Sequence, residues 1–173
     1  MINLGEDISA GLIAKIEREL PAFLVVKNAQ AAVVADGITA DTPVLYLDHV
    51  PAIEVQRAWP LVGLVHGKST FEDDQGYSMT GVHPFVIATF VQDHDQQALI
   101  RKIKRLTTCV CAAAIKDRYI PTVDQSARAA WGVRLVSVDW GEALADIPAG
   151  SDTPEAWLTW SEITLVCKTD EDA

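Results

Sequence analysis

Four histidines, His49, His66, His83 and His94, are the first residues to test for metal or acid–base chemistry. No two of them have the close helical spacing with which zinc enzymes chelate a metal from one helix face. His49 and His66 fall at the ends of predicted strands, where a half-buried, hydrogen-bonded histidine is the ordinary expectation. His66 and His83 could serve an enzyme cleft only together with a carboxylate within hydrogen-bond reach. We predict no metal site and keep catalysis as a competing hypothesis.

The three cysteines also admit a chemical and a structural interpretation. Cys109 and Cys111 form a C-x-C pair within a predicted helix. Two residues apart on a helix correspond to about 200° of rotation, so these thiols face opposite ways and cannot chelate together. We interpret both, with Cys167, as small packing residues. An odd number without a disulfide-like spacing predicts a soluble protein made in a reducing compartment.

Other catalytic patterns are missing from the sequence. Gly67 precedes Lys68 and Ser69, but the glycine loop that opens a helix in phosphate-binding motifs is absent. No serine has the G-x-S-x-G setting of a nucleophile. The acid pair Asp73 and Asp74 falls in a polar stretch, where solvated carboxylates are expected. The sequence therefore predicts no catalytic residue, no metal and no cofactor, and a protein that is not an enzyme.

The elements that would position these side chains are clearest between Val82 and Tyr119. An apolar strand, 84–91, runs into a long amphipathic helix, and Asp93 and Asp95 stand where a carboxylate can accept the free N–H groups of the helix start. Apolar residues then recur at intervals of three and four and predict one buried stripe. These are Leu99, Ile100, Ile103, Leu106, Val110 and Ala114.

An amphipathic helix is also predicted near the N-terminus, from Ile8 to Leu20, with Asp7 as its cap and Pro21 as its stop. Residues 23–26 fit either a short buried strand or a continuation of this helix. Asn28 is interpreted as the cap of a short helix that ends at Asp36 and Gly37. The stretch from 21 to 42 is the least determined part of the chain.

Five segments in all, several of them rich in β-branched and aromatic residues, are predicted strands. They are 44–49, 61–66, 82–91, 132–140 and 157–168. The connections 66–83, 120–130 and 141–154 are predicted to be long loops, and 169–173 a solvated acidic tail. This element order predicts a single α+β domain over residues 1–173. Its core would be a mainly antiparallel sheet of four to five strands, packed by the long helix and the N-terminal helix.

The net charge limits the kinds of partner that this domain can be expected to bind. The formal net charge is −10, which argues against a nucleic-acid-binding surface as the main function. Residues 91–125 form the only positive region, because they carry six basic and four acidic side chains. The N-terminus lacks the basic start and apolar stretch of a secretory signal. The longest uncharged helical run, 106–115, is half of what a bilayer requires, so no membrane association is expected.

The positive region includes Arg101, Lys102, Lys104 and Arg105 on the polar face of the long helix. This face either is solvated, complementing Asp93 and Asp95, or meets an acidic surface of a neighbouring subunit. Tryptophan and tyrosine bury large area at little rotamer cost and are favoured at interfaces. The candidate partner-contacting residues are Trp59, Phe71, Tyr77, Arg101, Lys102 and Arg105.

The order and length of these elements resemble the tail terminator (tail completion) proteins of tailed bacteriophages. The resemblance rests on the helix 8–20, the strand 43–47, the strand 77–91 leading into the helix from Asp95, and the closing segments 132–138 and 163–166. It covers most of the chain but includes no sharp motif. The chain is longer than many members of that family, and the excess falls in residues 21–42 and in the loops.

The resemblance implies a small α+β virion protein, assembled in the host cytoplasm, that forms a hexameric ring capping the tail tube. Its partners would be copies of itself, the tail tube protein and a head-side connector or stopper protein. DNA would pass through without specific binding, because an acidic channel repels duplex phosphates. The extra length leaves open another neck protein, such as a connector or stopper. A small cytosolic α+β enzyme or ligand-binding domain is the alternative from a different class.

Overall fold

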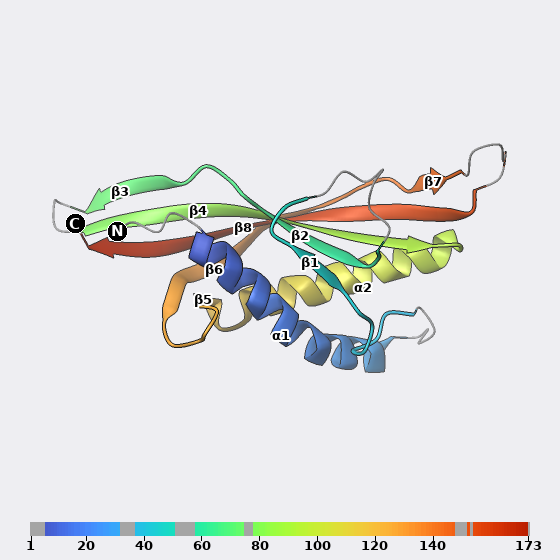
Figure 1. Cartoon of the computed structure of the whole chain (residues 1–173), viewed down its shortest axis with the longest axis horizontal. Helices are drawn as coiled ribbons and strands as arrows, with labels where there is room; N and C mark the ends of the chain where they lie inside the picture. Colours follow the sequence, from blue (N-terminus) through green and yellow to red (C-terminus); the bar gives the residue numbers. More distant parts are fainter. Residues whose placement is uncertain are drawn as a thin grey trace.

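The computed structural model describes residues 6–31, 37–50, 58–74, 78–147, 152 and 154–172. Within these residues, two α-helices, one short 3-10 helix and eight strands follow one another (Figure 1). In order they are α1 (Glu6–Gln30), β1 (Leu45–Leu47), β2 (Leu61–His66), β3 (Thr70–Asp74), β4 (Ser78–Asp93), α2 (Gln96–Ile115), η1 (Lys116–Arg118), β5 (Tyr119–Pro121), β6 (Arg128–Trp140), β7 (Leu144–Asp146) and β8 (Ala156–Asp172).

One sheet contains all eight of the described strands, in the order β1-β2-β4-β8-β6-β5, with β3 beside β4 and β7 beside β8. Every pairing is antiparallel except that of β1 with β2. The long strands β4 and β8 pair from Ser78 with Asp172 to Asp93 with Trp157. The predicted α+β class is confirmed. The predicted number of strands was too low, because β3, β5 and β7 lie in segments expected to be loops.

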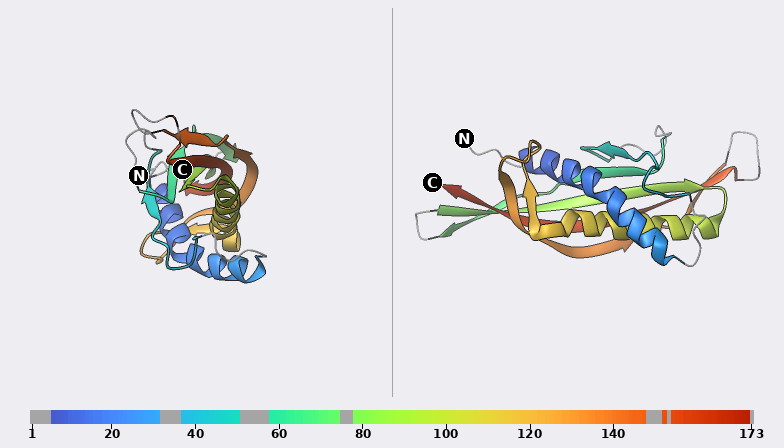
Figure 2. Two further views of the ribbon diagram at one scale, coloured as in Figure 1. Left: turned by 90° about the vertical axis from the view of Figure 1, so that its right-hand side faces the viewer. Right: turned by 90° about the horizontal axis from the view of Figure 1, so that it is seen from below.

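Both helices pack on one side of this sheet and close the main core (Figure 2). α1 contributes an apolar stripe that includes Leu12, Ile16 and Leu24, and α2 contributes Leu99, Leu106 and Val110. These side chains meet Phe85, Ile87, Ile163 and Leu165 from the two long strands. Burying apolar area of this kind is the dominant stabilising contribution to the fold.

The first helix does not stop at Pro21, so the predicted end at Leu20 was wrong. α1 continues to Gln30, and residues 23–26 are its continuation. Proline removes one backbone hydrogen bond, but Leu20 and Leu24 on either side of it are both buried in the core, which favours the continued helix. Asn28 lies inside α1 and donates from Nδ2 to the carbonyl of Ile38 at 2.9 Å, so it is no cap. Most of the predicted short helix falls outside the described residues.

The second helix begins as predicted. Asp95 is its N-cap and accepts a hydrogen bond from the backbone N–H of Gln97 at 2.8 Å, while Asp93 accepts from the N–H of Asp95 at 2.9 Å. The predicted stripe is buried except at Ile100, which is exposed. A position next to Leu99 is rotated by about 100° around the helix axis, and this places Ile100 outside the sector that faces the sheet.

At one end of the molecule β3, β4 and β8 run on together as a ribbon. We call residues 70–74, 78–82 and 168–172 the three-stranded extension; it projects beyond α1 in both figures. Over the described residues, the predictions of a loop at 66–83 and of an unstructured tail at 169–173 were therefore wrong; residues 75–77 and 173 lie outside them. Backbone ladder pairing with β4, which the local sequence does not reveal, orders both segments.

No helix in the described part of the chain is long and apolar enough to cross a membrane. The strand β2 occupies the predicted residues 61–66 without a shift. The other predicted strands are present with different ends: β1 is shorter than predicted, and β4, β6 and β8 are longer.

Candidate functional site

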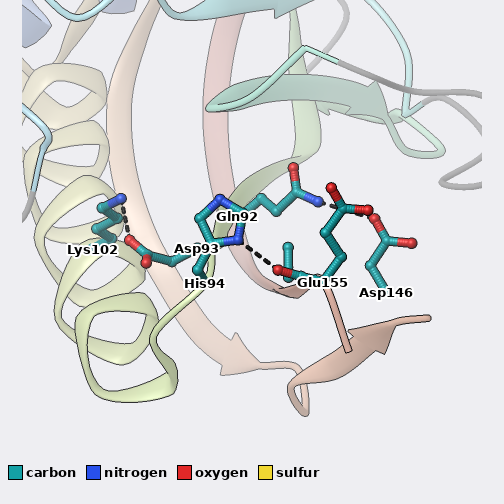
Figure 3. A pocket seen from close by; sticks show the side chains of 7 residues that line it. Gln92, Asp93, His94, Lys102, Asp146 and Glu155 are labelled. Atoms are coloured by element: carbon teal, nitrogen blue, oxygen red, sulfur yellow. Dashed lines mark hydrogen bonds and ion pairs between the residues drawn. The ribbon is translucent and has the colours of Figure 1, made fainter. Parts of the chain in front are cut away.

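A polar pocket of about 490 Å³ opens where β4 gives way to α2 (Figure 3). It is lined by Gln92, Asp93, His94, Lys102, Asp146, Glu155 and Ala156. β4 supplies Gln92 and Asp93, the β4–α2 turn supplies His94, and α2 supplies Lys102. β7 and the start of β8 form the opposite wall.

The charged and polar groups of this pocket bind one another. Lys102 forms an ion pair with Asp93, Gln92 donates to Asp146 Oδ2 at 3.2 Å, and Nδ1 of His94 lies 2.5 Å from the carbonyl oxygen of Glu155. Partial burial alone would raise the pKa of Asp93, but the N–H of Asp95 and the ammonium of Lys102 together lower it. The arrangement therefore holds a stable carboxylate and fixes the turn into α2.

His66 and His83 are brought together, as the competing enzyme hypothesis requires. Ser69 Oγ lies 3.0 Å from His66 Nε2 and 2.8 Å from His83 Nδ1, and His83 Nε2 lies 2.9 Å from Thr169 Oγ1. Burial lowers the pKa of both histidines, and the charge of His66 lowers that of His83 further. Neutral imidazoles suit this chain of hydroxyl contacts, because each then offers one donor and one acceptor.

This histidine network, formed by His66, Ser69, His83 and Thr169, holds neighbouring parts of the sheet together. It joins the β2–β3 connection to β4 and β8 at the base of the three-stranded extension. No carboxylate from the described residues takes part, although the enzyme hypothesis needs one to orient a histidine base. Gly81 makes room for the network, since a Cβ there would lie 2.6 Å from His83 Nε2 and 2.5 Å from Thr169 Oγ1.

The cysteines and the other acidic side chains give no metal centre in the described part of the chain, where no group of three metal-ligating side chains comes together. Cys109 and Cys167 are buried and Cys111 is partly buried. Burial raises the pKa of the thiols to about 11 for Cys109 and Cys111 and to about 12 for Cys167. Cys109 and Cys167 lie in the main core and Cys111 packs against it, as their interpretation as small packing residues predicts.

Of the basic residues predicted to contact a partner, Arg105 was misplaced on the solvated face. Only 6% of it is exposed, because the continued end of α1 lies over this part of α2. Lys27 and Gln30 from α1 line a groove of about 390 Å³ together with Arg101, Lys104 and Arg105. Lys102 turns to Asp93 instead, as the prediction of intramolecular complementarity requires.

Of the aromatic candidates, Trp59 is half-buried beside Phe90, with ring centroids 6.0 Å apart, in a small cluster on the far face of the sheet. Phe71 is 37% exposed and meets His83 edge-on. Tyr77 lies outside the described residues. Contact of these aromatic residues with a partner stays a prediction.

An exposed apolar strand is the feature that sequence reasoning missed. β6 pairs with β8 along most of its length, but β5 covers its other side only between Arg128 and Trp131. From residue 132 through β7 to residue 147, no other described strand pairs on that side; we call this segment the β6–β7 edge (Figure 2). Five large apolar side chains on it are between 42% and 55% exposed: Leu135, Val136, Trp140, Leu144 and Ile147.

A second pocket, of about 350 Å³, lies on this edge where the β5 pairing stops. Gly132, Val133, Arg134 and Leu135 form one wall, and Ile115 and Arg118 form the other. Asp117 and Arg118 both have positive φ, 57° and 53°, which is strained for residues other than glycine. The β-branched and aromatic residues of 132–140 predicted the strand, but only the topology shows which of its sides has no partner among the described strands.

Comparison with protein-family profiles finds no match, and comparison with curated proteins finds none. Among solved structures, the chain is similar to one chain of a structure described as the virion of a native gene transfer agent (GTA) particle. The two are 18% identical with a TM-score of 0.35, over 90% of this chain and 97% of the other. Similarity at that level does not define a shared function.

Proposed function

We propose that this chain is a structural subunit of a phage-like particle: a tail terminator that forms a hexameric ring, caps the tail tube and joins it to the head-side connector. The observation that carries an assembly role is the β6–β7 edge, where unpaired backbone groups and five exposed apolar side chains stand together. Exposed edges of this kind are sites where another chain adds a strand, and monomeric proteins normally block them.

The element order supports the finer assignment. The segments on which the resemblance to tail terminators rests are an N-terminal helix, a strand near residue 45, a long strand leading into a long helix, and two closing strands. Each of these elements is present in the same order as α1, β1, β4 with α2, β6 and β8.

Charge is consistent with a ring through which DNA slides. Each copy carries a formal charge of −10, so acidic side chains that line the channel would repel duplex phosphates. The basic groove beside α2 and the aromatic Phe71 would then make protein contacts. A ring whose channel is lined by lysine and arginine would contradict this assignment of surfaces.

The direct test removes the chain from the particle that contains it. Without a terminator, tail tubes should continue to grow, and electron micrographs should show over-long tubes separate from heads. Tubes of normal length beside leaking heads would indicate a stopper instead. Normal, complete particles would contradict any assembly role.

A further inference from the structure

The β6–β7 edge has a site at which a partner strand can be anchored. At Gly132, whose φ is 61°, the chain leaves the part of β6 that β5 covers. The pocket beside it has apolar walls from Ile115, Val133 and Leu135. The partner at this point should therefore be an extended strand with an apolar or aromatic side chain, because it can satisfy backbone groups and fill the pocket together.

Two arginines give this site a charge preference. Arg118 and Arg134 line the same pocket, and both are exposed. Arg118 is held at the rim by the positive-φ pair at the end of α2, a strained backbone that tends to occur where a side chain must be placed for function. A partner strand with a carboxylate next to its aromatic residue is favoured, since guanidinium groups bind carboxylates with charge-assisted hydrogen bonds.

The chain itself carries such a strand at the opposite edge of its sheet. β3 pairs with β4 on one side, and no other described strand pairs with it on the other. Phe71 and Glu72 are neighbours on β3, and both are exposed. The rest of β3 is also acidic in sequence, with Asp73 and Asp74.

We propose that β3 of one copy pairs with the β6–β7 edge of the next copy, with Phe71 at the apolar pocket and Glu72, on the opposite face of the added strand, beside Arg134. The two surfaces differ and lie at opposite edges of one sheet. The contact is therefore head-to-tail and can repeat until a ring closes. This inference rests on the proposed ring function and names the contact that would build it.

Charge reversal tests the contact in the full-length chain. Glu72→Arg and Arg134→Glu should each weaken self-association, measured by analytical ultracentrifugation, by about tenfold or more. The double variant, which restores opposite charges, should associate more tightly than either single variant. Phe71→Ala should also weaken association, and added salt should weaken the wild type.

Matched controls make the same charge changes away from the contact. Glu17→Arg and Arg18→Glu on α1 alter exposed residues outside both surfaces and should leave self-association unchanged. All the substituted residues are exposed, and circular dichroism would verify that each variant is folded.

Several outcomes would overturn the contact. These are a wild type that stays monomeric up to about 100 µM, oligomers that ignore the Glu72 and Arg134 changes, and a double variant no better than the single ones. Duplex DNA binding that Arg134→Glu abolishes and Glu72→Arg leaves intact would assign the arginines to phosphate instead. Rings that ignore these changes would leave the proposed function standing, whereas particles that are normal without the chain would refute that function and not the contact.

Discussion

The ammonium of Lys15, in the middle of α1, donates a hydrogen bond to the carbonyl of Ala114 in the last turn of α2 at 3.0 Å. It also donates to the carbonyls of Lys116 and of Tyr119, the latter at 2.6 Å. Helix-terminal carbonyls lack partners within their helix, and a cation there is favourable. One side chain that is only 2% exposed thus fixes α1, the end of α2 and the start of β5 together.

Replacing Lys15 with methionine should destabilise the fold by about 2–4 kcal/mol, because three carbonyls, one buried and two partly buried, lose a charged donor while the apolar stem is kept. Urea denaturation followed by circular dichroism measures the loss. Lys27→Met on the same helix is the control, since Lys27 is exposed, and it should change the free energy of unfolding very little. Equal effects at the two sites would contradict the capping role.

The same lysine predicts a pH dependence. Burial lowers the pKa of Lys15 from 10.5 to about 8, against the smaller raising effects of Asp117 and Glu19. Between about pH 8 and 10.5 the unfolded chain therefore binds more protons at this residue than the folded chain, so its contribution favours folding increasingly as pH rises. Burial of the cysteines opposes this trend, because it raises the pKa of their thiols.

The quantity to measure is therefore the difference in unfolding free energy between the wild type and Lys15→Met. We expect this difference to widen from pH 7.5 to pH 10, since the thiol contributions cancel in the comparison. A constant or shrinking difference would show that Lys15 does not have a lowered pKa in the folded chain.

The histidine network predicts sensitivity to acid. The pKa values of His66 and His83 are lowered in the folded chain, so below the ordinary value of 6.5 the unfolded chain binds more protons. Their contribution to stability is complete above pH 6.5 and is lost as the pH falls below it. Between pH 7.5 and pH 5, His83→Gln should therefore lose less stability than the wild type. A His83→Gln variant that loses as much stability as the wild type would contradict the structural role of the network.

Gly11 allows α1 to approach β5 closely, because it has no side chain. A Cβ at this position would lie 2.2 Å from the carbonyl oxygen of Pro121 and 3.1 Å from a methyl carbon of Ile120. Alanine is favoured over glycine in a helix by about 1 kcal/mol. Gly11→Ala should nevertheless be net destabilising, because the backbone of Pro121 cannot easily move away from the added methyl group. Ala10→Gly at the neighbouring exposed position measures the propensity alone. A Gly11→Ala variant more stable than the wild type would contradict this packing.

Sequence reasoning succeeded where local chemistry decides the structure. Asp95 caps α2 because its carboxylate reaches the free N–H of Gln97, and that pattern is visible in a few residues. It failed at Pro21, where the helix-stopping tendency of proline is overridden by burial of Leu24 in the core. It failed again at β3, which pairs with the start of β4 just after it in the chain, and at the end of β8, whose order depends on pairing with the same remote part of β4.

The candidate surfaces show the same division. Phe71 is exposed as an interface residue should be, while Arg105 is covered by a length of α1 that the sequence did not predict. The β6–β7 edge could not be predicted at all, because an alternating strand pattern does not tell which neighbours a strand has. That property belongs to the topology, in which β5 is too short to cover β6.

The measurement that bears most directly on the ring is averaged electron microscopy of the purified chain combined with its native mass. We expect closed rings with a central channel and a mass six times the 18.8 kDa of one chain. A single copy at every concentration, or a compact closed dimer without a channel, would contradict the account.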